Sequence, residues 1–250
     1  MELQGIKSDL ILAKKAAIDS GKFLQREKEK VNQRTNSDSK DIKLRADIES
    51  ENIIKSIITS QSSYPILAEE SGKSSKSLGD IFWVIDPLDG TANFHRNIPI
   101  CCVSIGLVHN MKPLLGVIYD FDNDHIYSGN TLENISEMND MPINVSNKSE
   151  RKESILITGL PHDTDYSDQS LSNMIEDMKT WQKVRMIGSA AMAACYIASG
   201  KADFYQERGI YLWDIIAGAA IVKSAGGNAK IFNHRQNFQV DVIFSNSKVK

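Results

Sequence analysis

The sequence predicts an α/β fold of stacked helix and sheet layers, arranged as two closely packed lobes. Two stretches with apolar residues at helical spacing open the chain, and short β-rich runs cluster behind them in the first half. Strand-like and helix-like runs then alternate, a pattern typical of helices packed on sheets. The 250 residues, 41% of them hydrophobic, are enough for a sizeable core. We expect one lobe over 1–147 and another over 148–250, acting as one unit.

Apolar spacing predicts the elements of the first half. The spacing from Ile6 to Leu24 predicts a helix over about 6–26, and the polar stretch 28–43 predicts a loop. Isoleucines at helical spacing after Asp47 predict a second helix with Asp47 as its N-cap. β-rich runs predict strands at 66–68, 81–85, 102–108 and 114–119, of which the second ends at Asp86.

The same criteria predict the second half. Strands are expected at 155–158, 184–187, 202–205, 229–232 and 240–244, and helices near 170–181, 189–199 and 214–225. Gly226-Gly227 is expected to stop the last helix. The change of pattern between the halves places the lobe boundary near 144–154.

Composition excludes several function classes. A formal net charge of -3, from 29 basic and 32 acidic residues, provides no broad positive field for nucleic acid or an anionic membrane. No stretch approaches the roughly 20 apolar residues of a membrane span, and the N-terminus lacks the pattern of a secretory signal. Cys101, Cys102 and Cys195 fit neither a disulfide framework nor a C-x-x-C site. We therefore expect a cytoplasmic protein that binds neither nucleic acid nor membrane.

Two carboxylates follow the strand predicted at 81–85. Asp86 and Asp89 lie three residues apart, with a proline stiffening the turn and Gly90 allowing a ligand to approach the backbone. Carboxylate oxygens are ligands that Mg²⁺ prefers. A helix starting at Gly90 or Thr91 would point its free N–H groups at a phosphate. Because the same residue types are typical of a surface turn, the motif alone leaves both interpretations open.

Three segments resemble the signatures of one enzyme family. Residues 83–94, Trp-Val-Ile-Asp-Pro-Leu-Asp-Gly-Thr-Ala-Asn-Phe, look like the first signature of the inositol monophosphatase family. Residues 213–219, Trp-Asp-Ile-Ile-Ala-Gly-Ala, followed by Ala-Gly-Gly at 225–227, are similar to its second signature. Residues 68–71, Ala-Glu-Glu-Ser, resemble the family's Gly-Glu-Glu-Ser. The resemblance covers nearly the whole chain, and it implies an alternating α-β-α-β-α sandwich of the sugar phosphatase type.

The resemblance also implies where metal ions bind. Carried over position by position, the ligands are the carboxylates of Glu69, Asp86, Asp89 and Asp214 and the backbone carbonyl of Leu88. These groups would hold two or three Mg²⁺ ions. Taken alone, Glu69 is also explained as a surface charge at a strand end, and Asp214 as the N-cap of its helix.

Further positions are implied for the water and the substrate. Asp47, with the Thr91 hydroxyl, would orient the attacking water, a role compatible with an N-cap, although residues 40–47 depart from the family's Val-Thr-x-x-Asp pattern. Glu207 would accept a hydrogen bond from a substrate hydroxyl, and the alternative is a solvated loop carboxylate. The remaining substrate-binding residues would be Gly90, Thr91, Ser189, Ala190 and Asp214. The turn at 188–191 is equally explained by close helix packing.

Other positions leave alternatives open. His95 and Arg96 would reach a second anionic group of the substrate or lie on the surface. Residues 128–134 depart from the family's Gly-x-Gly-Ala hairpin, and Lys250 comes where relatives tend to add a helix, so the pocket rim or a dimer face could differ. No H-E-x-x-H, G-x-S-x-G or G-x-x-x-x-G-K-[ST] motif occurs, so nothing indicates zinc, a serine triad or nucleotide triphosphate binding.

The sequence therefore predicts a homodimeric, magnesium-dependent phosphomonoesterase that hydrolyses a small polyol or sugar phosphate, such as inositol 1-phosphate, with a metal-activated water. The alternatives within the superfamily are a 3'(2'),5'-bisphosphate nucleotidase, a fructose-1,6-bisphosphatase, and a histidinol-phosphate or sugar-phosphate phosphatase. Ala92-Asn93-Phe94, where nucleotidases tend to have Lys-Glu-Phe, favours the inositol branch. The alternative of another class is a regulatory, partner-binding protein on the same fold.

Overall fold

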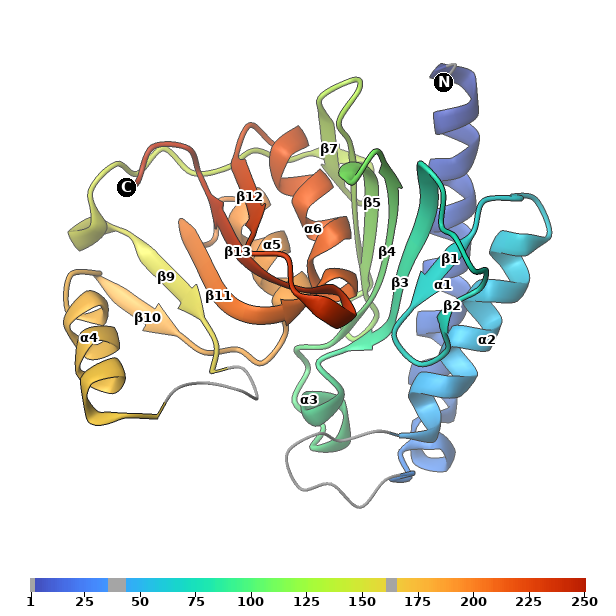
Figure 1. Ribbon diagram of the computed structural model, residues 1–250, viewed down its shortest axis with the longest axis horizontal. Helices are drawn as coiled ribbons and strands as arrows, with labels where there is room; N and C mark the ends of the chain where they lie inside the picture. Colours follow the sequence, from blue (N-terminus) through green and yellow to red (C-terminus); the bar gives the residue numbers. More distant parts are fainter. Residues whose placement is uncertain (1–2, 36–43, 161–165) are drawn as a thin grey trace.

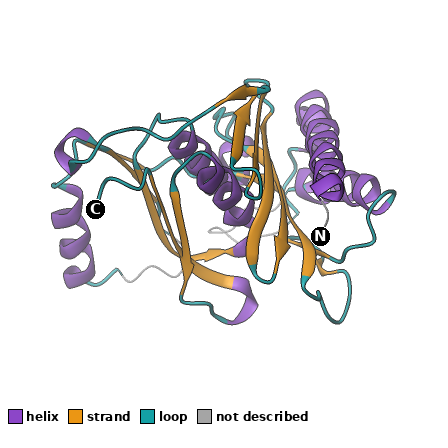
Figure 2. Cartoon of the chain, turned by 90° about the horizontal axis from the view of Figure 1, so that it is seen from above, coloured by secondary structure: helices purple, strands orange, loops and turns teal. Residues whose placement is uncertain are grey.

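The computed structural model describes residues 3–35, 44–160 and 166–250, which form alternating layers of helix and sheet. Within these residues the layers are a helix pair, an eight-stranded sheet, a second helix pair, a five-stranded sheet and a single outer helix (Figure 1). Seen from above, the two sheets stand on either side of the second helix pair (Figure 2). The predicted α-β-α-β-α sandwich is confirmed.

The first helix pair consists of α1 (Leu3–Val31) and α2 (Arg45–Thr59), which pack against each other and against the first sheet. α1 buries the apolar stripe that the sequence predicts, including Ile6 and Leu24. It continues to Val31, so the predicted loop over 28–43 is wrong for its first four positions. Residues 36–43 of that loop lie outside the described residues.

Asp47 lies inside the first turn of α2 and is not the N-cap that the sequence predicts. Leu44 is the N-cap residue, and the Oδ2 atom of Asp47 accepts a 2.7 Å hydrogen bond from the Leu44 N–H group. This is the backward bond of a capping box. It fixes the Asp47 carboxylate at the start of the helix, and the second oxygen, Oδ1, lies 3.1 Å from the Thr91 hydroxyl.

The first sheet takes all its strands from one continuous part of the chain. These are β1 (Ile66–Ala68), β2 (Gly72–Lys73), β3 (Ile81–Asp89), β4 (Cys102–His109), β5 (Lys112–Asp120), β6 (His125–Asn130), β7 (Ile135–Met138) and β8 (Met141–Pro142). Their order is β2-β1-β3-β4-β5-β6-β7-β8, with β1 and β3 parallel and the other neighbours antiparallel. The four predicted strands are confirmed. The predicted end of the second at Asp86 is wrong, because β3 continues to Asp89.

The second helix pair, α5 (Ala190–Ala198) and α6 (Leu212–Ser224), lies between the sheets. Glycines on β4, β5 and β6 let α6 approach the first sheet closely. A Cβ atom on Gly116 would lie 2.1 Å from the Ala217 carbonyl oxygen, and one on Gly129 would lie 2.5 Å from the Ile221 Cα atom. Tyr211 is the N-cap of α6, so Asp214 is its third residue and the N-cap interpretation of Asp214 is wrong.

The second sheet follows the first in the sequence. Its strands are β9 (Ile155–Thr158), β10 (Lys183–Arg185), β11 (Phe204–Tyr211), β12 (Asn228–Phe232) and β13 (Gln239–Ser245), in the order β10-β9-β11-β13-β12. The outer helix α4 (Asp168–Met178) lies on the outer side of this sheet, near β9 and β10 (Figure 1). The predicted strand at 202–205 is displaced, since β11 begins at Phe204 and runs to Tyr211.

Short helical segments complete the described structure. They are α3 (Thr91–His95) and the 3-10 turns Arg151–Glu153 and Gln236–Phe238. Among the described residues, no helix has both the length and the apolar character that crossing a membrane requires.

Candidate active site

Acidic side chains from separate elements meet at one end of the first sheet. They are Asp47 of α2, Glu69 directly after β1, Asp86 and Asp89 of β3, and Asp214 of α6. Asp86 shares side-chain hydrogen bonds with both Glu69 and Asp214. The structure therefore brings together the carboxylates that the sequence predicts, although they come from positions far apart in the chain.

A β-bulge explains why Asp86 and Asp89 face the same side of β3. In a regular strand, residues three apart point to opposite faces of the sheet. Asp86 pairs with Ser104 of β4 and Asp89 with Cys102, so β3 carries one extra residue between the two pairs. Such a bulge shifts the alternation of side chains by one. The strand thereby presents both carboxylates to one point.

The two carboxylates have different hydrogen-bond partners. One oxygen of Asp86 accepts a 3.0 Å bond from the Leu88 N–H group. Asp89 Oδ2 accepts a 2.8 Å bond from the Ala191 N–H group and a further short bond from the Ser189 hydroxyl. Ser189 is also the N-cap of α5. Asp89 Oδ2 is therefore fixed by the helix layer, and no side chain of the described residues donates a hydrogen bond to Oδ1.

Thr91 connects Asp47 to the bulge. Its hydroxyl lies 3.1 Å from Asp47 Oδ1 and 3.0 Å from the Leu88 carbonyl oxygen. A hydroxyl has one hydrogen and can donate to only one of these acceptors at a time. The preceding Gly90 has a φ of 86°, and a Cβ atom there would lie 2.8 Å from the Ile100 carbonyl oxygen. The helix that follows is only five residues long, and binding of a phosphate by its first N–H groups stays a prediction.

Burial and mutual repulsion raise the pKa values of these acids. Burial, followed by the charges of Asp214 and Asp47, raises the pKa of Glu69 well above its ordinary value. Burial likewise raises the pKa of Asp47 to about 7. For Asp86 and Asp214 burial is again the first cause, and neighbouring carboxylates add to it. Within the described residues no Lys or Arg forms an ion pair with this cluster, so its charge is not neutralised by the protein itself.

The donor set fits a divalent cation. Within the described residues, no three His, Cys, Asp or Glu side chains lie close enough together to coordinate one metal ion without moving. Mg²⁺ does not require such a trio, because it uses one or two carboxylates and keeps water or phosphate oxygens in its other positions. Buried carboxylates without a cationic partner are the chemistry that such an ion neutralises. Glu69, Asp86, Asp89 and Asp214, with the Leu88 carbonyl, therefore remain the proposed ligands.

A pocket of about 390 Å³ opens beside the acidic cluster. Five of the predicted residues line it, namely Asp89, Ser189, Ala190, Glu207 and Asp214, together with apolar side chains of β9 and β11. In the described part of the chain, Gly90 and Thr91 are not among its lining residues. The pocket is therefore placed to take the part of a ligand that extends from the carboxylates toward the second sheet.

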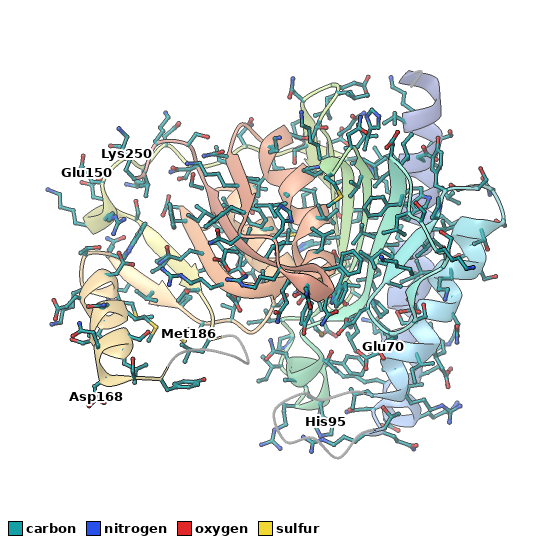
Figure 3. The ribbon with its side chains drawn as sticks, viewed as in Figure 1. Glu70, His95, Glu150, Asp168, Met186 and Lys250 are labelled. Carbon is teal, nitrogen blue, oxygen red and sulfur yellow. The ribbon has the colours of Figure 1, made fainter. Side chains whose placement is uncertain are left out.

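Glu207 is a pocket residue of β11 and not the solvated loop carboxylate of the alternative interpretation. It accepts a 2.8 Å hydrogen bond from the Tyr205 hydroxyl. Burial raises the pKa of Glu207 to about 7, although the Tyr205 bond acts in the opposite direction. By contrast, His95 is bound through its ring Nδ1 atom to the Asn32 side chain at 2.8 Å, at the outer end of α3 (Figure 3). Neither His95 nor Arg96 lines the pocket in the described residues, which favours the surface interpretation.

Sequence reasoning missed two residues that connect this region. The Asn93 side-chain amide donates to the carbonyl oxygens of Ile100 and Ile187, each at 2.8 Å, and so ties α3 to the turn before α5. Asn93 lies inside the first signature, and this position could have indicated its role from the sequence. Glu51 of α2 accepts a 2.9 Å bond from the Glu70 N–H group. It supports the turn that carries Glu69. Nothing in its sequence position on the helix indicates this contact.

Comparison with known proteins identifies relatives over most of the chain. The model of the inositol monophosphatase family matches residues 7–247. A protein of Pasteurella multocida named Nus factor SuhB is 37% identical over 73% of this chain and 68% of its own length. An inositol-1-monophosphatase of Synechocystis sp. is 38% identical over 75% of this chain and 66% of its own length. These alignments thus span about two thirds of the relatives.

Solved structures extend the similarity to nearly the full chain. The inositol monophosphatase from Anabaena superimposes with a TM-score of 0.83 at 33% identity, covering 97% of this chain and 92% of that one. The extragenic suppressor protein SuhB from Bartonella henselae superimposes with a TM-score of 0.85 at 27% identity, covering 96% and 95%. The fold is therefore that of a known group of proteins.

Proposed function

This chain belongs to the inositol monophosphatase family, and from that premise we propose that it is a magnesium-dependent phosphatase acting on a small polyol or sugar phosphomonoester. One observation carries the proposal: a cluster of buried carboxylates, which has no Lys or Arg partner among the described residues, lies beside a pocket that Asp89 and Asp214 line. A divalent cation would neutralise the carboxylates and attract a phosphate to the same place.

The proposed ligands are those named above, and bound Mg²⁺ would supply charge neutralisation at the phosphate and a lowered pKa of water. The chain's own residues would provide orientation. Asp47 Oδ1 and the Thr91 hydroxyl, 3.1 Å apart, form a donor and acceptor pair that can orient a water between α2 and α3. The raised pKa of Asp47, about 7, suits a group that accepts a proton near neutral pH.

The substrate alcohol would occupy the pocket between the two lobes. Ser189 and Ala190, at the start of α5, line this pocket, and Glu207 of β11 lines it too and would offer its carboxylate to a hydroxyl group. A polyol or sugar has such hydroxyl groups next to its phosphate. We propose the lobes to be 1–147 and 148–250, together forming one catalytic unit, and the protein to be a cytoplasmic homodimer.

A phosphate-release panel tests the function. The purified protein is given inositol 1-phosphate, fructose 1,6-bisphosphate, adenosine 3',5'-bisphosphate and several sugar monophosphates, with Mg²⁺ and with EDTA. We expect the highest kcat/KM on a monophosphate, and only with Mg²⁺. The nucleotidase or bisphosphatase alternative would be supported if a bisphosphate were preferred. The same preparation, analysed by sedimentation, tests the dimer.

Three of the relatives are named Nus factor SuhB, and this name favours a second candidate, a protein that acts by binding a partner. The acidic cluster argues against an exclusively structural role, because a non-catalytic descendant has no chemical need for converging carboxylates. The panel separates the candidates. A protein that binds Mg²⁺ but releases phosphate from none of these substrates would support the partner-binding function.

A further inference from the structure

Gly159 and Glu207 lie in direct contact at the pocket wall. β9 and β11 are parallel neighbours, with Thr158 opposite Gln206, so the next residues along the two strands lie side by side. A Cβ atom on Gly159 would lie 2.4 Å from Glu207 Oε2 and 2.6 Å from its Cδ atom. Any side chain at position 159 would therefore occupy the space that the Glu207 carboxylate fills.

Tyr205 fixes the same carboxylate through a hydrogen bond. Its hydroxyl donates a 2.8 Å hydrogen bond to Glu207 Oε2, and its ring is almost completely buried against Phe244. The phenol is thus fixed by packing in the second sheet. Since Oε2 is occupied by Tyr205, and the described residues include no partner for Oε1, the second oxygen is the one available to a ligand in the pocket.

We propose that Gly159 and Tyr205 are positioning residues that hold Glu207 ready to accept a hydrogen bond from a substrate hydroxyl, and that they thereby set the preference for polyol phosphates. This inference rests on the proposed function. The absence of a side chain at Gly159 leaves space for the Glu207 carboxylate, and the hydrogen bond from Tyr205 fixes the orientation of that carboxylate. A carboxylate fixed in this way loses less conformational entropy when it binds a hydroxyl than a freely rotating one.

The Gly159→Ala substitution is suited to testing this arrangement. The atoms that an added methyl group would meet belong to the end of a flexible side chain and not to the backbone. The fold can therefore accept alanine by moving the Glu207 carboxylate away from its position. Tyr205→Phe removes only the hydroxyl group and keeps the buried ring. Gly5→Ala is the matched control, because no atom of the described structure lies within 4 Å of a Cβ atom there.

The experiment is a double-mutant cycle on two substrates. Gly159→Ala, Tyr205→Phe and Glu207→Ala are made singly, and the first two are also combined with Glu207→Ala. The kcat/KM values are measured with Mg²⁺ for inositol 1-phosphate and for p-nitrophenyl phosphate, which has no hydroxyl group on its ring. We expect each single variant to lose about tenfold or more on inositol 1-phosphate, and to lose less on p-nitrophenyl phosphate.

The cycle gives distinct outcomes. In the Glu207→Ala background, Gly159→Ala and Tyr205→Phe should each lower kcat/KM on inositol 1-phosphate by less than about twofold further. If the loss of each substitution instead multiplies with that of Glu207→Ala, while the parent protein is an active phosphatase, the two residues act independently of Glu207. The proposed function then stands and the positioning roles are overturned. If the parent releases phosphate from neither substrate, the proposed function fails and the recognition role fails with it. A crystal structure of Gly159→Ala with the Glu207 carboxylate still in place would also overturn the inference, independently of activity.

Discussion

Asp89 at the end of β3 accepts a 2.8 Å hydrogen bond from the backbone N–H group of Ala191 in the first turn of α5. The same oxygen accepts the Ser189 hydroxyl. One carboxylate thus joins the first sheet to the helix layer behind the pocket. Because the Asp89 carboxylate both accepts these bonds and places its charge close to Asp86 and Asp214, its two roles can be separated by substitution.

Asp89→Asn should retain the fold and lose activity. The amide oxygen of asparagine can accept the bonds from Ser189 and Ala191, so the free energy of unfolding should change little. The negative charge is removed from the proposed metal site, and kcat should fall by about a hundredfold or more. Phosphate release and urea unfolding measure the two effects. A variant that hydrolyses phosphomonoesters at the parent rate with Mg²⁺ would refute the ligand assignment.

Asn93→Ala should weaken the link between α3 and the turn before α5. The substitution removes the donor for the Ile100 and Ile187 carbonyl oxygens. Leaving such acceptors without a partner costs about 1–3 kcal/mol, and we expect urea denaturation to report a loss in this range. Asn173→Ala on the exposed face of α4 is the control and should change stability by less than about 0.5 kcal/mol. Equal effects of the two variants would contradict the interpretation.

Much of the fold could be predicted because the central strands have their own apolar pattern. β3, β4 and β5 are buried runs rich in β-branched and aromatic residues, and the family signatures cover β3 with the start of α3, and the first half of α6. β6, β7 and β8 carry weaker patterns. They are strands because each pairs with a neighbour in the sheet, which is information that a local window does not contain.

The helix starts at Asp47 and Asp214 were mispredicted for one reason. An acidic residue is favourable both at an N-cap and two or three residues later, so its presence does not distinguish the positions. The true N-caps, Leu44 and Tyr211, carry no capping side chain and gave no signal. Likewise, the contact of Gly159 with Glu207 arises from parallel strand pairing, which sequence spacing does not reveal.

Gly116→Ala should be strongly destabilising. The added Cβ atom would lie 2.1 Å from the Ala217 carbonyl oxygen and 2.7 Å from its Cα atom, so α6 or the first sheet would have to move. Overpacking of this kind costs about 3 kcal/mol or more when backbone is involved.

Gly5→Ala in α1 is the opposite case. With open space around it and a helical backbone, alanine there should stabilise by about 0.5–1 kcal/mol. Thermal and urea unfolding of the two variants should thus diverge, and similar midpoints would refute the close approach of α6.

The acidic cluster makes stability depend jointly on pH and Mg²⁺. In the unfolded chain these carboxyl groups titrate near about pH 4. In the folded protein burial raises the pKa of Asp47 to about 7, and the pKa values of Glu69, Asp86 and Asp214 are also raised. A carboxyl group with a raised folded-state pKa stabilises the fold below its unfolded pKa, and this contribution is lost as the pH rises through the folded value.

The metal-free protein should therefore lose stability between about pH 4 and about pH 7, and Mg²⁺ should restore it by favouring the charged carboxylates. We expect saturating Mg²⁺ to raise Tm by roughly 5–10 °C at about pH 8 and by much less at about pH 5. Differential scanning calorimetry with Mg²⁺ and with EDTA at both pH values measures this. Asp86→Asn should reduce the difference, whereas Asp168→Asn on the exposed start of α4 should leave it unchanged. A Mg²⁺ effect that is equal at both pH values would mean that these carboxylates do not bind the ion.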